Sequence, residues 1–108
     1  MKTVIVLNTD QMGHGDPVLG HKILGTFLRK SRAIEGLEAI VFYNAGVKLL
    51  IDGSPHLGEL SLLEENGIDL LACVTCIDHY GIEIAVGTVS NMDEIIAEMA
   101  RAEKVITL

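Results

Sequence analysis

The sequence predicts an α/β fold, with a mostly parallel sheet of about five strands and helices on both of its faces. Short apolar runs alternate with amphipathic helical patterns along the whole chain, and strands that alternate with helices imply a parallel sheet. Apolar residues make up 49% of the sequence and the mean hydropathy is +0.41, which suits a sheet buried on both faces. At 108 residues, without repeats or linker-like stretches, the chain is expected to form one domain over residues 1–108.

The first strand and the first helix have clear signals. Continuous apolar and β-branched residues predict a strand over Thr3–Leu7. A loop over residues 8–16 follows. Asp16-Pro17 then predicts a helix start, because aspartate caps free N–H groups and proline suits the first helical position. We expect this helix to face the sheet through one apolar stripe, made of Leu19, Ile23, Leu24, Phe27 and Leu28.

The middle of the chain repeats the alternation. Residues 37–43 indicate the second strand, and Asn44-Ala45-Gly46 indicates a turn. Residues 47–51 are apolar and fit either a strand or a helical turn. Ser54-Pro55 predicts another helix start by the same cap-then-proline pattern, and Asn66-Gly67 predicts its end. The side chains expected to face inward are Leu57, Leu60 and Leu63.

The last part of the chain begins with a buried strand over residues 68–72, followed by a short helix that ends at Gly81. Residues 82–86 are expected to form the fourth strand. Ser90, with Asp93 three residues on, predicts a capped helix start. That helix carries a stripe that fits the core or a subunit interface, made of Met92, Ile95, Ile96, Met99 and Ala100. Residues 104–108 indicate the last strand.

Charge and hydropathy argue against several classes of partner. The formal net charge of -7 argues against nucleic acid or an anionic membrane, since both need a basic surface. No apolar run approaches the roughly 20 residues that span a bilayer. The N-terminus indicates a strand and not a signal peptide. We therefore expect a cytoplasmic protein, in which two cysteines seldom form a structural disulfide.

The segment Cys73-Val74-Thr75-Cys76 is the strongest candidate for chemistry. Cys73 is expected where a strand meets a helix, at the sheet edge where α/β proteins bind ligands, and a helix N-terminus favours a thiolate. Such a thiolate can carry a persulfide. Cys76, about one helical turn further on, can resolve it as a disulfide. In the alternative interpretation both cysteines are buried core residues.

The glycine loop Met12-Gly13-His14-Gly15-Asp16 does not match a nucleotide-binding pattern. Val18 stands where the dinucleotide pattern needs a third glycine, and no Lys-Ser or Lys-Thr pair follows. This loop and the turn after the second strand both leave carboxyl ends of the sheet, so they are expected to line a pocket near Cys73. The expected lining residues are Met12, Gly13, His14, Asn44, Gly46 and Val47.

Neither a metal site nor a cofactor site is expected. The four histidines are scattered at positions 14, 21, 56 and 79, without the spacing of metal ligands. A single Cys-x-x-Cys pair cannot supply four zinc ligands. His79, three residues after Cys76, fits either a surface residue or a neighbour that tunes that thiol.

Ordered motifs along nearly the whole chain match a known family. They include Met12-Gly13-His14-Gly15-Asp16, Phe42-Tyr43-Asn44-Ala45-Gly46-Val47 and Cys73-Val74-Thr75-Cys76-Ile77-Asp78-His79-Tyr80-Gly81. In their order and spacing the chain resembles the DsrE/DsrF-like family of sulfur-relay proteins. Within it the chain is most similar to the DsrE-like domain of the YedF-type branch, which is sulfurtransferase-like and associated with selenium metabolism. The resemblance implies a three-layer α/β/α sandwich and a homotrimer or hexamer.

The resemblance also implies roles for the two cysteines. In that family the cysteine at the end of the third strand carries a persulfide, and this position is Cys73. Cys76 matches a second cysteine typical of the YedF-type branch. Val74 stands where that branch often has glycine, and the segment after Gly81 is shorter than usual. That branch usually carries a preceding TusA-like domain, so a separate TusA-like carrier is expected here as sulfur donor or acceptor.

The leading hypothesis is therefore a sulfurtransferase-like sulfur-relay protein that carries a persulfide on Cys73, with Cys76 assisting. Two alternatives stay open. One is a thiol–disulfide redox protein that uses both cysteines without transferring sulfur. The other is a non-catalytic oligomeric binding module. The link to selenium comes from the resemblance and not from particular residues.

Overall fold

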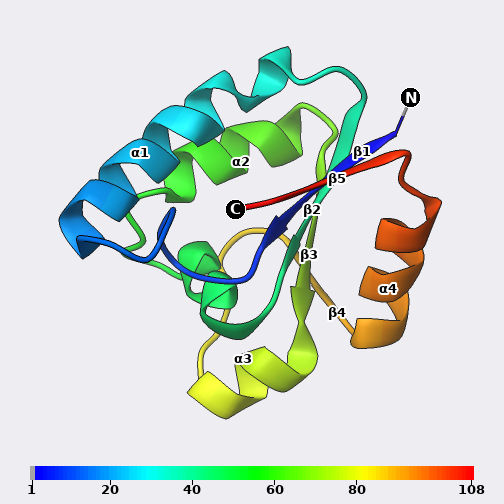
Figure 1. Ribbon diagram of the computed structural model, residues 1–108. Helices are drawn as coiled ribbons and strands as arrows, with labels where there is room; N and C mark the ends of the chain where they lie inside the picture. Colours follow the sequence, from blue (N-terminus) through cyan, green and yellow to red (C-terminus); the bar gives the residue numbers. More distant parts are fainter. Residues whose placement is uncertain (1) are drawn as a thin grey trace.

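A computed structural model describes residues 2–108 and places five strands in one parallel sheet, in the order β4-β3-β2-β1-β5 (Figure 1). Every neighbouring pair of strands is parallel, which confirms the predicted type of sheet. The strands are β1 (Thr3–Leu7), β2 (Leu37–Phe42), β3 (Asp69–Cys73), β4 (Thr88–Ser90) and β5 (Lys104–Thr107).

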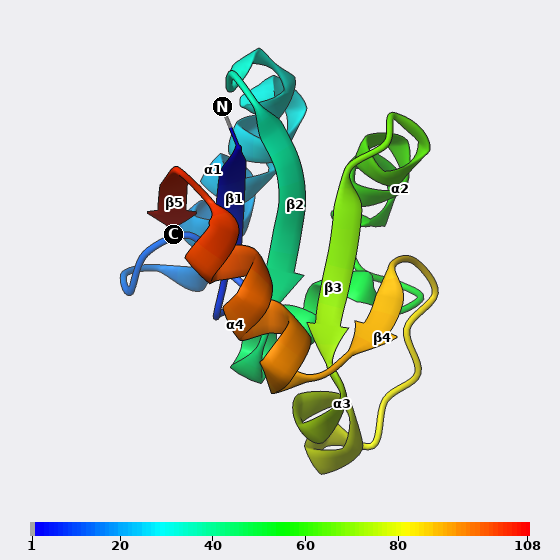
Figure 2. The ribbon, with the colours of Figure 1, turned by 90° about the vertical axis from the view of Figure 1, so that its right-hand side faces the viewer.

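Helices cover both faces of the sheet, as predicted. Helices α1 (Pro17–Lys30) and α2 (Leu57–Glu65) lie on one face, and α4 (Met92–Arg101) lies on the other (Figure 2). The strand order explains this division. From β1 to β4 the chain steps across the sheet in one direction, and from β4 it returns to β5 in the opposite direction. Because crossovers between parallel strands are right-handed, the return helix lies on the opposite face.

Three short helices complete the chain. The 3-10 helices η1 (Ser31–Ala33) and η2 (Asn44–Leu50) follow α1 and β2. Residues 47–51, which fitted either a strand or a helical turn, therefore belong mainly to a helical segment. The third, α3 (Val74–Tyr80), lies beyond the carboxyl end of β3, where Figure 1 shows it at one end of the molecule.

The core has two parts, one on each face of the sheet. Alternate residues of β1 point to opposite faces, as the two-residue period of a strand requires. Ile5 and Leu7 pack in the cluster that contains side chains of α1 and α2. Val4 and Val6 pack in the smaller cluster with Ile95 of α4. All five β1 residues are buried, so this strand is the centre of the core.

The prediction for the buried face of α1 was only partly right. Leu24 and Leu28 are fully buried, but Leu19 and Ile23 are 54% and 40% exposed. The buried face instead includes Gly20 and Gly25. A Cβ at Gly20 would lie 2.9 Å from the Cβ of Gln11, so the glycine lets the loop pack directly against the helix. A hydrophobicity pattern does not count glycine, and it therefore misplaced the buried stripe.

The prediction of the fourth strand at residues 82–86 was wrong, because β4 lies at Thr88–Ser90. The apolar residues Ile82, Ile84 and Val86 pack against the core from an irregular segment. The N–H of Ala85 donates to the carbonyl oxygen of Leu50 at 2.8 Å, so this backbone is bonded to the end of η2 and not to a strand. Gly87, with φ of +89°, then turns the chain into β4.

Two predicted helix caps were wrong. Ser90 belongs to β4, where it pairs with Cys73, and the cap of α4 is Asn91, whose side chain accepts from the N–H of Glu94 at 2.9 Å. Ser54 lies in the turn before α2, where its Oγ accepts from the N–H of His56 at 3.2 Å. In contrast, the cap at Asp16 is confirmed, since its carboxylate accepts from the N–H of Leu19 at 2.8 Å.

The predicted inward face of α2 was also partly right, and the apolar stripe of α4 lies only partly in the core. In α2, Leu60 and Leu63 are buried, whereas Leu57 is half-buried. In the stripe of α4, Ile95 is buried, but Met92 and Ile96 are exposed. A single helix covers that face of the sheet, so only one side of its apolar stripe finds a core to pack against.

A partly buried pair of histidines joins α1 to the turn before α2. Nδ1 of His21 lies 3.1 Å from Nε2 of His56, and the two rings are stacked at a centroid distance of 5.4 Å. His56 is only 4% exposed. Burial lowers the pKa of His56, and the neighbouring His21 lowers it further.

Candidate functional site

Both cysteines lie at the junction between β3 and α3, where the sequence predicted them. Cys73 is the last residue of β3, and α3 begins at the next residue. The helix stops at Gly81, whose φ of +61° is a left-handed conformation that glycine adopts easily. The predicted order of strand, short helix and terminating glycine is therefore confirmed.

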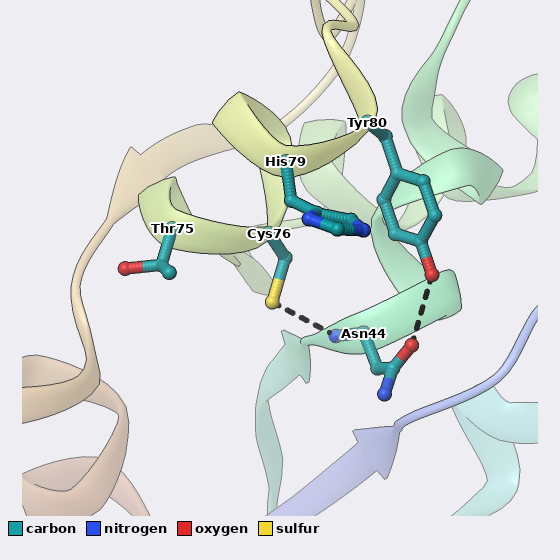
Figure 3. A pocket seen from close by; sticks show the side chains of 5 residues that line it. All are labelled: Asn44, Thr75, Cys76, His79 and Tyr80. Carbon is teal, nitrogen blue, oxygen red and sulfur yellow. Dashed lines mark hydrogen bonds between the residues drawn. The ribbon is translucent and has the colours of Figure 1, made fainter.

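The two thiols differ in their access to solvent. Cys73 is 2% exposed and packs in the cluster on the α4 face of the sheet. Cys76 is half-buried and lines a cavity of about 260 Å³ (Figure 3). The cavity is lined by Asn44, Thr75, Cys76, His79 and Tyr80. In the structure, Cys76 is therefore the thiol that faces this cavity.

Asn44 holds the sulfur of Cys76 from the opposite side of the cavity. The N–H of Asn44 donates to Sγ of Cys76 at 3.0 Å. The side chain of Asn44 is held in turn by Tyr80, whose hydroxyl donates to Oδ1 of Asn44 at 2.9 Å (Figure 3). The two contacts tie η2 to α3, although these segments are more than 30 residues apart in the sequence.

The backbone of Asn44 has an unusual conformation. Its φ of +52° is the only positive φ at a non-glycine residue within residues 2–108. Asparagine tolerates this left-handed region better than most residues, but such conformations still occur mainly where the surroundings fix them. Gly46 supplies part of that constraint, because a Cβ there would lie only 2.0 Å from the carbonyl oxygen of Leu7. The end of β1 therefore presses directly against η2.

Tyr80, in the wall of the cavity, contacts one aromatic and one cationic side chain. The ring of His79 meets the ring of Tyr80 edge to face, at a centroid distance of 5.1 Å. Nζ of Lys48 lies 4.3 Å from the centroid of the Tyr80 ring. These contacts hold Tyr80 in place beside Asn44.

The pKa values of the two thiols are shifted in opposite directions. Burial alone would raise the pKa of Cys73, but hydrogen bonds from the N–H and thiol of Cys76 and from the N–H and hydroxyl of Thr75 hold that pKa below its ordinary value. Burial raises the pKa of Cys76, the N–H of Asn44 opposes this, and the hydrogen bond with Cys73 and its charge raise the pKa further. The first proton lost by the pair is therefore assigned to Cys73.

The residues predicted to line the pocket fall into three groups. Asn44 lines the cavity at Cys76. Gly13 and His14 line a second cavity of about 230 Å³, at the carboxyl ends of β1 and β5. Met12 packs against the core, and Gly46 and Val47 are buried.

Sequence reasoning did not assign Thr75, His79 and Tyr80 to the cavity. His79 and Tyr80 follow Cys76 by three and four residues, the spacing that places side chains on one face of a helix. That spacing was the signal available in the sequence.

Within residues 2–108, no group of three or more His, Cys, Asp or Glu side chains is arranged to hold a metal ion. The part of the chain that the structure describes also has no helix long and apolar enough to cross a membrane.

Fold and site together define an α/β protein with a pair of interacting thiols at the carboxyl edge of a parallel sheet. The family model for the DsrE/DsrF-like family matches residues 1–108. The chain therefore belongs to the DsrE/DsrF-like family, which is associated with sulfur relay. No curated protein matches the chain.

Solved structures share the fold over nearly the whole chain. The YchN protein from E. coli superposes with a TM-score of 0.72 at 18% identity, covering 99% of this chain and 98% of its own. The protein MTH1491 from Methanobacterium thermoautotrophicum superposes with a TM-score of 0.72 at 22% identity, covering 99% and 98%. The protein BT1422 from Bacteroides thetaiotaomicron gives 0.68 at 23% identity, covering 99% and 94%. The latter two are described as proteins of unknown function, and these similarities show the fold alone.

Proposed function

We propose that this protein is a sulfur-relay protein that holds sulfur as a persulfide on Cys73 and passes it to an acceptor thiol. Membership of a family associated with sulfur relay supports the class of function. The observation that carries the proposal is the position of Cys73, which ends β3 at the carboxyl edge of the sheet and is the N-cap of α3; although burial would raise the pKa of this thiol, groups of Cys76 and Thr75 lower it. A thiolate is the form that attacks sulfur, and a lowered pKa increases the fraction of the thiol that is ionised.

The chemistry needs no cofactor. In the first half of the cycle the terminal sulfur of a donor persulfide is transferred to the sulfur of Cys73, the S–S bond of the donor breaks, and the donor leaves as a thiolate. In the second half the same sulfur is transferred from Cys73 to an acceptor thiolate, and its bond to Cys73 breaks. Each step is a thiol exchange without net oxidation or reduction.

The donor or acceptor in this proposal is a TusA-like carrier, and the proposal assigns the chain to the YedF-type branch with its link to selenium metabolism. The Cys73-x-x-Cys76 pair supports that placement. A homotrimer or hexamer belongs to the same proposal. The exposed apolar side chains Val89, Met92 and Ile96 support an assembly that would cover them.

The test is to load the protein with inorganic polysulfide, remove the donor, alkylate the protein and locate the added sulfur by peptide mass spectrometry. We expect one reducible extra sulfur atom on Cys73 of the wild type, and its transfer to an added acceptor thiol. The double variant Cys73→Ser/Cys76→Ser controls for sulfur bound elsewhere and should carry none. A wild type that takes up no sulfur would refute the proposal and leave the cysteines as packing residues.

A thiol–disulfide redox protein is the second candidate. The packing of Cys76 against the cluster that contains Cys73 and the opposite shifts of the pKa values of the two thiols favour it. A pair of this kind can lose two electrons and form the Cys73–Cys76 disulfide. Titration in glutathione buffers distinguishes the two functions, because this candidate predicts a defined reduction potential and no stable added sulfur.

A further inference from the structure

Cys73 has no direct route to a donor larger than a few atoms. It is 2% exposed, and it does not line the cavity at the end of β3. For sulfur transfer, three sulfurs must lie roughly in one line: the attacking sulfur, the terminal sulfur of the donor persulfide, and the inner sulfur of the donor, which leaves. Cys73 instead packs in the buried cluster that contains Val41 and Ile95.

Cys76 has the properties that Cys73 lacks. It lines the open cavity of about 260 Å³, and its sulfur accepts the N–H of Asn44 at 3.0 Å (Figure 3). That N–H is held in place by the left-handed backbone of Asn44 and by the contact of its side chain with Tyr80. A fixed N–H donor stabilises negative charge on the sulfur as its bond to the next sulfur forms or breaks.

The two cysteines are also neighbours in space, since Cys73 is the N-cap of α3, Cys76 lies three residues further on in that helix, and Cys76 packs against the cluster that contains Cys73. This proximity allows a proton and a sulfur atom to pass between the two residues. Building on the proposed sulfur-relay function, we infer that Cys76 is the thiol that receives sulfur from an organic persulfide in the cavity, and that Cys73 takes it from Cys76.

The proposed sequence balances at each step. The thiol proton of Cys76 moves to the thiolate of Cys73 while Sγ of Cys76 attacks the terminal sulfur of a donor R–S–SH. The new Sγ–S bond forms, the donor S–S bond breaks, and the donor leaves as a thiolate that takes up a proton from solvent. Cys76 then carries the persulfide, and Cys73 is a neutral thiol.

The second step moves the sulfur inward. The sulfur of Cys73 attacks the terminal sulfur on Cys76, and the S–S bond to Cys76 breaks. Cys76 leaves as a thiolate, which the N–H of Asn44 stabilises, and takes up the proton that Cys73 loses. The sum of both steps converts R–S–SH and Cys73–SH into R–SH and a Cys73 persulfide. No oxidant or reductant is consumed.

The experiment uses glutathione persulfide as the probe, with wild type, Cys76→Ser and Cys73→Ser, and follows loading against time by quenched peptide mass spectrometry. We expect sulfur on Cys73 in the wild type, at least tenfold slower loading of Cys73 in Cys76→Ser, and sulfur trapped on Cys76 in Cys73→Ser. Matching thermal unfolding curves establish that each variant is folded. A Cys76→Ala variant repeats the measurement without a residual hydroxyl.

Two results would overturn the inference. One is loading of Cys73 in Cys76→Ser within threefold of the wild-type rate. The other is a Cys76 that stays unloaded in Cys73→Ser even at a pH high enough to ionise Cys76 without the Cys73 thiolate as base. Either result leaves the proposed function intact as long as the wild type still carries sulfur. A wild type that accepts no sulfur from glutathione persulfide or from inorganic polysulfide refutes the proposed function itself.

Discussion

The variant Gly46→Ala tests whether the close contact between η2 and β1 maintains the site. A Cβ at this position would lie 2.0 Å from the carbonyl oxygen of Leu7 and 2.8 Å from its carbonyl carbon. Ordinary contacts begin at 3.4 Å, so the two segments would have to separate by about 1.4 Å. Both are backbone, which cannot rotate away as a flexible side chain can.

The effect on stability and on the site follows from that displacement. Forcing extra atoms into a packed interior costs about 1–3 kcal/mol, and a backbone clash belongs at the upper end. For a chain of this size, each kcal/mol lowers the melting temperature by about 4 °C or more, so a loss of about 10 °C is expected. Asn44 lies two residues before Gly46, and its N–H would move away from Sγ of Cys76, which raises the pKa of that thiol further.

The assay is thermal unfolding, together with the pH dependence of alkylation at Cys76. Gly58→Ala is the matched control, because Gly58 lies in α2 and an added Cβ would meet nothing within 4 Å. In a helix, alanine is favoured over glycine by up to about 1 kcal/mol, so the control should melt higher than the wild type. If Gly46→Ala melts within 2 °C of the wild type and leaves the alkylation profile unchanged, the reasoning about this contact is refuted.

Three further predictions concern other parts of the molecule. Folding lowers the pKa of His56, so the contribution of this residue to the free energy of unfolding is full above a pH of about 6.5 and falls as the pH drops toward the pKa of His56 in the folded protein. His56→Gln should flatten this pH dependence of stability in urea titrations. An unchanged pH dependence would contradict the role of the pair with His21. Asp16→Ala should cost about 1 kcal/mol through loss of the helix cap, measured by urea denaturation, and a wild-type midpoint would show that the cap contributes nothing. Tyr80→Phe should lower stability by about 0.5–1.5 kcal/mol and move the alkylation midpoint of Cys76 upward, whereas an unmoved midpoint would separate Tyr80 from the positioning of that sulfur.

Much of the fold could be predicted from local patterns. The strand at Thr3–Leu7, the cap at Asp16 and the strand–helix junction at Cys73 are each specified by a few adjacent residues. The fourth strand could not be predicted in this way. Residues 82–86 are the more apolar segment, but they pack as a loop, and the short strand that actually pairs with β3 carries two exposed residues out of three. Hydrogen bonding to β3, and not the apolar character of the segment, determines which residues form the fourth strand.

The site was predictable only in part for a similar reason. The sequence places Cys73 and Cys76 together at the end of a strand, but it does not show which thiol faces the cavity. That depends on contacts across more than 30 residues, between η2 and α3. The glycine loop was expected at the same pocket because it also leaves a carboxyl end of the sheet. However, β2 lies between β1 and β3, and Gly13 and His14 line a separate cavity.

The position of β5 beside β1 has a consequence for how the chain folds. Pairing Phe42 with Ala72 joins β2 to β3 across 30 residues, whereas pairing Thr3 with Lys104 joins β1 to β5 across 101 residues. Closing the longer loop costs only about 1 kcal/mol more entropy, so the arrangement is cheap at equilibrium. In time it is the last pairing to become possible, since non-local contacts form late in folding. Until β5 has paired, one edge of β1 is free. During folding, β1 is therefore the strand most exposed to pairing with another chain, although it lies at the centre of the finished core.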